Sequence, residues 1–80
     1  MRIRTLLFAS YRDLAGTDSL ELELPPGATG RDLVARLRER AGMERLPPEP
    51  ALAVNHVHAP LSTGLADGDE VALLPPVAGG

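Results

Sequence analysis

The sequence has 80 residues, of which 44% are hydrophobic and 24% charged, enough for one small domain with a thin core. The formal net charge of −3 and an aromatic content of 2% argue against nucleic-acid binding, because neither phosphate attraction nor base stacking is provided. Cysteine and lysine are both missing, which excludes disulfides, thiol nucleophiles, cysteine-held metals and amine catalysis by lysine.

The chain shows no internal repeat and no domain linker. No apolar run approaches the length of about 18 residues that a membrane-spanning helix needs, and residues 1–4 begin a strand pattern rather than a signal peptide. We therefore expect a soluble cytoplasmic protein that binds neither membranes nor nucleic acids.

The first quarter of the chain predicts a strand, a short helix and a second strand. Residues 1–9 alternate in polarity, as in a strand. Ser10 is a candidate N-cap for one helical turn over residues 11–15, which Gly16 ends. Residues 18–24 alternate leucine with glutamate, the pattern of a half-buried strand.

A longer amphipathic helix follows a Pro-Pro-Gly break at residues 25–27. Thr29, with Asp32 three residues later, resembles a capping box. Gly42 stands where a C-cap is expected. One apolar stripe of this helix is formed by Leu33, Val34, Leu37 and Ala41.

The second half of the chain predicts short strands at residues 51–55 and 70–74, the last one entered through a tight turn at residues 67–69. The order strand–strand–helix–strand–strand needs a single sheet with one face covered by the helix. We expect an α+β fold of the ubiquitin-like β-grasp type, a mixed sheet packed on one main helix. Residues 1–74 form the domain and residues 75–80 an extended, flexible C-terminal tail.

The tail "PPVAGG" is the strongest candidate for a functional segment. Pro75 and Pro76 cannot extend a strand and project the chain stiffly outward. The six tail residues reach about 20 Å at most. Gly79 and Gly80 bring only backbone into a receiving site, which suits delivery of a carboxylate down a narrow tunnel. The alternative is an ordinary frayed terminus.

Three other groups of residues are weighed against simpler explanations. His56 and His58 are spaced i, i+2, but no further ligand completes a zinc site, so solvated turn histidines are favoured. Turn chemistry accounts for the acidic residues at 67, 69 and 70 better than a metal site does. The arginines of the long helix are interpreted as a solvated face partly paired with Asp32 and Glu39 rather than as an anion-binding surface.

An apolar patch is predicted on the uncovered face of the sheet. If the helix covers the Ile3 and Leu7 side of the first strand, Phe8 and Leu6 face the bare side. Leu74 and Ala72 alternate in the same way in the last strand. A patch of this kind beside the tail is typical of an interface, and the alternative register places Phe8 in the core.

Three segments together resemble a known family. "LLFASYRDLAG" (residues 6–16), "AVN" (53–55) and "LADGDEVALLPPVAGG" (65–80) are similar to the small, sulfur-carrier subunits of molybdopterin synthase. The similarity covers most of the chain, although the helix matches in pattern more than in letters. Leu7, Leu73 and Leu74 stand where the family often has phenylalanine.

The resemblance implies a carrier that is not catalytic alone. An ATP-dependent activating enzyme adenylates Gly80, a sulfur donor protein converts it to a thiocarboxylate, and the large synthase subunit passes the sulfur to a pterin precursor. No cofactor is bound stably and no metal is expected. Phe8, Leu74 and Arg12 are predicted to dock partners. The tail residues predicted to deliver the reacting end are Pro75, Pro76, Val77, Ala78 and Gly79.

Three alternatives stay open from the sequence. The chain could carry sulfur for thiamine or another sulfur metabolite with the same tail. It could be a ubiquitin-like modifier that forms isopeptide bonds through Gly80, or a plain ubiquitin-like interaction domain that does not need Gly79 and Gly80.

Overall fold

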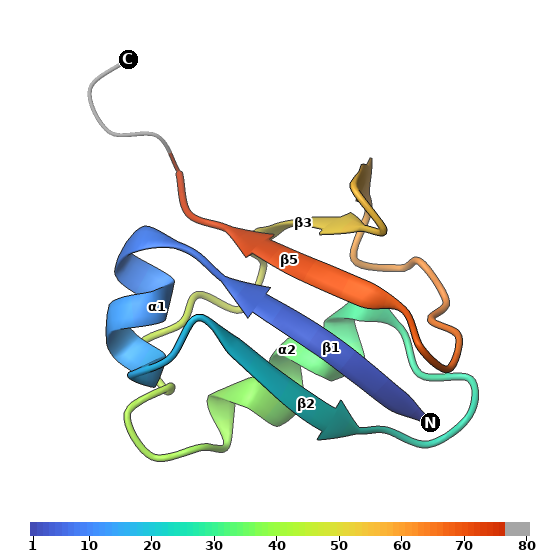
Figure 1. Ribbon diagram of the computed structural model, residues 1–80, viewed down its shortest axis with the longest axis horizontal. Helices are drawn as coiled ribbons and strands as arrows, with labels where there is room; N and C mark the ends of the chain where they lie inside the picture. Colours follow the sequence, from blue (N-terminus) through green and yellow to red (C-terminus); the bar gives the residue numbers. More distant parts are fainter. Residues whose placement is uncertain (77–80) are drawn as a thin grey trace.

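The computed structural model describes residues 1–76 of the chain, which form one five-stranded sheet and two helices (Figure 1). The strands are β1 (Arg2–Leu7), β2 (Ser19–Glu23), β3 (Ala51–Val54), β4 (Val57–Ala59) and β5 (Glu70–Leu74), and the helices are α1 (Ala9–Ala15) and α2 (Gly30–Arg38). The sheet order is β2-β1-β5-β3-β4, with β1 and β5 parallel and every other pair antiparallel. This confirms the predicted ubiquitin-like β-grasp architecture.

One face of the sheet packs on α2, which lies behind the sheet in Figure 1. The alternation of β1 sends Ile3, Thr5 and Leu7 into the core, where each is at most 1% exposed. Leu33 and Leu37 of α2 are fully buried and belong to the same cluster as the inward residues of β1 and β5. Within residues 1–76 no helix covers the opposite face of the sheet, as expected for a sequence with one long amphipathic helix.

The capping box at the start of α2 is confirmed, but the predicted end of the helix is wrong. The Thr29 side chain accepts from the Asp32 backbone N–H, and the Asp32 carboxylate accepts from the Thr29 backbone N–H. The helix ends at Arg38, so Ala41 is exposed outside it and Gly42 is not its C-cap. The chain turns early because this buries two large side chains, Met43 and Leu46, which are at most 1% exposed.

The start of α1 also differs from the prediction. The helix begins at Ala9 after Phe8 as N-cap, with no side-chain cap, and Ser10 lies exposed inside it. Ala9 takes a positive φ of 47°, which turns the chain sharply out of β1. The sharp turn brings Tyr11 into the core, where it is 4% exposed. Gly16 ends the helix in the left-handed conformation, as predicted.

A polar network joins the end of β3 to the start of β5, at the opposite end of β5 from the tail. The Asn55 side chain donates to Asp69 and accepts from the Glu70 backbone N–H, both at 3.0 Å. Asn55 and His56 both have positive φ and form the two-residue turn that joins β3 to β4.

Neither helix of residues 1–76 is long and apolar enough to cross a membrane.

Candidate functional site

The root of the tail lies where the two central parallel strands end. Parallel pairing places the carboxyl ends of β1 and β5 at the same edge, and Leu7 pairs with Leu73. Figure 1 shows β1 and β5 side by side and running in the same direction. Phe8 follows β1 directly, and Pro75 and Pro76 follow β5. The predicted delivery residues Val77, Ala78 and Gly79 and the predicted reacting residue Gly80 lie outside the described residues.

The uncovered face of the sheet is apolar near this root. The register places Leu6 beside Ala72 and Leu74 beside Ala51. Phe8 is 46% exposed, one of two large hydrophobic side chains that stand clearly exposed in the described part of the chain. We name Leu6, Phe8, Ala72 and Leu74 the root patch. Its exposure agrees with the predicted register and excludes Phe8 from the core, while the docking roles of Phe8 and Leu74 stay predictions.

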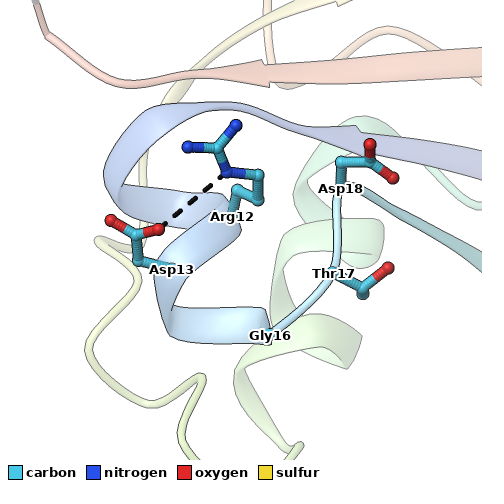
Figure 2. Close-up of a pocket in the computed structure, with 5 residues that line it drawn as sticks. All are labelled: Arg12, Asp13, Gly16, Thr17 and Asp18. Carbon is cyan, nitrogen blue, oxygen red and sulfur yellow. Dashed lines mark ion pairs between the residues drawn. The ribbon is translucent and has the colours of Figure 1, made fainter.

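Arg12 lies beside the root patch. Its side chain is 57% exposed and its Nε lies 3.9 Å from Asp13 Oδ1, a loose surface ion pair that contributes little stability. Figure 2 shows this pair on α1, with Thr17 and Asp18 on the segment after Gly16. Phe8 and Arg12 line one hollow together, so the structure brings these two predicted docking residues onto one surface.

An open groove also lies at the tail root and shares Leu74 with the root patch. Its walls are mainly apolar, and Leu74, Pro75 and Pro76 form one of them. We name it the root groove. The remaining lining residues are Tyr11, Pro47, Glu49, Pro50, Ala51 and His58. The Glu49 carboxylate lies 3.4 Å from Arg31 Nη1, so Arg31 pairs with the loop before β3 rather than with Asp32 or Glu39.

Tyr11 is a candidate functional residue that the sequence prediction missed. Its hydroxyl oxygen is buried and has no hydrogen-bond partner among the described residues. Burial raises the pKa of Tyr11 above its ordinary value of 10, so the hydroxyl stays protonated at neutral pH. The available signal was the helical spacing of Tyr11, Leu14 and Ala15, which marks the inward face of α1.

The acidic residues of the turn at 67–70 have structural roles, and the two histidines do not form a metal site within residues 1–76. Asp67 accepts from the Arg2 backbone N–H at 2.7 Å, and Asp69 accepts from Ala66, as turn chemistry predicts. His56 lies in a turn, with its Nε2 3.3 Å from Glu70 Oε1. His58 was also predicted in a turn, but it lies in β4. Within residues 1–76 no three His, Asp or Glu side chains gather as a metal site.

Comparison with known proteins gives similarities that run over the full length of the chain. Residues 5–80 match the model of the ThiS family. The molybdopterin synthase sulfur carrier subunit of Chlamydomonas reinhardtii is 35% identical over 83 residues, covering 100% of both chains. The subunit of the same name from Escherichia coli is 36% identical over 80 residues, covering 98% of this chain and 99% of its own.

Solved structures show the same fold. SAMP1 of Haloferax volcanii, a small archaeal modifier protein, superposes with a TM-score of 0.86 at 28% identity, covering 100% of both chains. A putative molybdopterin converting factor subunit 1 from Pyrococcus furiosus gives 0.82 at 33% identity, covering 96% of this chain and 99% of its own. A chain from the complex of subunits 1 and 2 of the molybdopterin-converting factor of Helicobacter pylori gives 0.72 at 28% identity, covering 100% of both chains.

Proposed function

The chain belongs to the ThiS family, and from that membership we propose that it is the sulfur carrier subunit of a molybdopterin synthase. The observation that carries the proposal is the match to curated subunits of that name over their whole length, at 35–36% identity. The aligned region covers the whole chain and so includes the Pro-Pro-Val stem and the Gly-Gly pair, which are the segments that the chemistry needs.

The reacting group in this proposal is the carboxylate of Gly80. A terminal carboxylate has a pKa of about 3.3–3.7, so at neutral pH it is an anion and a poor electrophile. An activating enzyme transfers AMP from ATP to this carboxylate and releases pyrophosphate, which creates a good leaving group. A sulfur donor protein then displaces AMP and leaves a thiocarboxylate on Gly80. The chain itself holds no cofactor in this scheme and is not catalytic alone, and ATP belongs to the activating enzyme.

The described residues support delivery of that group by the tail. β5 ends at Leu74, and Pro75 and Pro76 direct the chain away from the sheet without backbone donors. The root patch and Arg12 supply an apolar surface and a cation beside the point where the tail leaves. A large subunit docked there would receive Val77 to Gly80 in its active site and transfer the sulfur to a pterin precursor. We place this chemistry in the cytoplasm, where ATP is available.

Reconstitution with purified components tests the proposal. The thiocarboxylated chain, mixed with the large subunit of molybdopterin synthase and the pterin precursor, is expected to yield the dithiolene product, with one sulfur consumed per carrier. The same chain with an ordinary carboxylate at Gly80 is the matched control and is expected to yield none. Product formation with a thiazole-forming enzyme of thiamine synthesis, and not with the large subunit, would assign the chain to the other pathway.

Protein modification is a second candidate function, because the small archaeal modifier SAMP1 superposes so closely. In that function an activated Gly80 is captured by the ε-amine of a lysine on another protein. Immunoblots of cell extracts separate the two functions, since a carrier stays a free monomer and a modifier gives a ladder of conjugates.

A further inference from the structure

The root groove has a volume of about 690 Å³, within the range of sites that hold a ligand. Its walls offer few hydrogen-bond donors because four of its lining residues are prolines, of which Pro50 is buried and Pro76 exposed. Its one carboxylate, that of Glu49, already faces Arg31. The groove therefore suits an apolar, uncharged segment.

Tyr11 lines this groove, and its buried hydroxyl lacks a hydrogen-bond partner in residues 1–76. A buried hydroxyl without a hydrogen bond lowers stability, since it gives up its bonds to water. Thr5 carries the second such hydroxyl of the described residues, but it lies in β1 and faces the core between the sheet and α2. Both residues thus carry a buried hydroxyl without a partner, and of the two only Tyr11 lines the root groove.

We propose that the root groove receives an extended apolar segment of the large synthase subunit, and that the Tyr11 hydroxyl, which is shielded in the free protein, donates a hydrogen bond to a backbone carbonyl of that segment once side chains of the groove move to admit it. The inference rests on the proposed function, because it concerns the protein that takes up the tail. Any protein that encloses residues 77–80 must also lie against Pro75 and Pro76, and these residues form a wall of the groove. The groove is thus continuous with the tail-receiving interface.

The chemistry of the groove selects a neutral acceptor. The Tyr11 hydroxyl is a donor at neutral pH, since the ordinary pKa of tyrosine is about 10 and burial raises the pKa of Tyr11 further. A carboxylate from the partner would lose its water against mainly apolar walls, whereas a backbone carbonyl carries no charge. Tyr11 is therefore a positioning residue, which holds the partner beside the tail root and takes no part in sulfur transfer.

The test compares Tyr11→Phe with Thr5→Val in the full-length chain. Each substitution removes a buried hydroxyl that has no partner and keeps nearly the same shape, so both variants are expected to fold and to resist urea at least as well as the wild type. Titration calorimetry with the purified large subunit is expected to show about tenfold weaker binding for Tyr11→Phe. Thr5→Val is expected to bind as the wild type does.

A spectroscopic measurement separates a contact from a structural effect. The chain contains one tyrosine, so 3-fluorotyrosine labels Tyr11 alone. Its ¹⁹F resonance is expected to shift when the unlabelled large subunit is added. An unchanged resonance, equal binding by Tyr11→Phe and wild type, or equal weakening by Thr5→Val would overturn the inference and leave the proposed function standing. A wild-type chain that fails to bind the large subunit would overturn both.

Two other occupants of the groove are outcomes of the same experiment. If deletion of residues 77–80 moves the ¹⁹F resonance of the free protein, the chain's own tail fills the groove and the inference is wrong. If the resonance of the free protein moves with its concentration, a second copy fills the groove, and the inference is again wrong. A resonance that is insensitive to both changes, and that shifts with the large subunit, supports it.

Discussion

Removal of Gly79 and Gly80 is expected to abolish molybdenum cofactor production in cells that depend on this chain as their only carrier. The activated group is the carboxylate of Gly80, and shortening the chain by two residues withdraws the reacting end by about 7 Å. A carboxylate on Ala78 therefore stops short of the active sites of both the activating enzyme and the large subunit. Molybdoenzyme activity is expected to fall to the level of cells without the gene.

Gly64→Ala is a matched control for this deletion. Gly64 lies on the surface, its φ is not positive, and an added Cβ meets nothing within 4 Å. The control is expected to restore full activity. Both variants are expected to melt as the wild type does, because neither change touches the core residues found within residues 1–76. Full activity of the shortened chain would rule out chemistry at Gly80 and leave a plain interaction domain.

Replacement of Phe8 by glutamate is expected to weaken binding of the large subunit at least about 100-fold. Burial of a phenylalanine contributes about 1.5–3 kcal/mol, and glutamate adds the cost of placing a charge in an apolar contact. The side chain of Phe8 is 46% exposed in the free protein, so its removal costs the isolated fold little. Calorimetric titration of the variant with the large subunit measures the loss.

Val57→Glu is the matched control for Phe8→Glu. Val57 is 67% exposed and is the other large hydrophobic side chain found exposed within residues 1–76. It lies in β4 and pairs with Val54, whereas Ala51, at the other end of β3, pairs with Leu74 beside the tail root. The control is expected to bind normally. Equal losses in the two variants, or none in Phe8→Glu, would remove the root patch from the interface.

The fold was predictable from local patterns because each pattern has a direct physical cause. Alternation in β1 separates Leu7 from Phe8, and the single amphipathic helix leaves one face of the sheet bare. The Thr29 and Asp32 capping box fixes the start of α2. Each of these patterns involves residues that lie close together in the sequence, so it can be recognised without the structure.

The features that were missed depend on contacts between distant segments. The end of α2 is decided by Met43 and Leu46, which gain more from the core than Ala41 gains from another helical turn. The burial of Tyr11 depends on a sharp turn at Ala9, where no glycine marks the positive φ. The groove at the tail root joins α1, the loop before β3 and the end of β5, and no local pattern connects these three segments.

The central claim is that the carboxyl end of this chain carries transferable sulfur. Intact-mass analysis of the protein purified from its own cells tests it most directly, since replacement of one oxygen by sulfur adds about 16 Da. We expect a fraction of the protein at this higher mass, and we expect that fraction to vanish when Gly79 and Gly80 are deleted. A single unshifted mass in cells that are actively making the molybdenum cofactor would contradict the account.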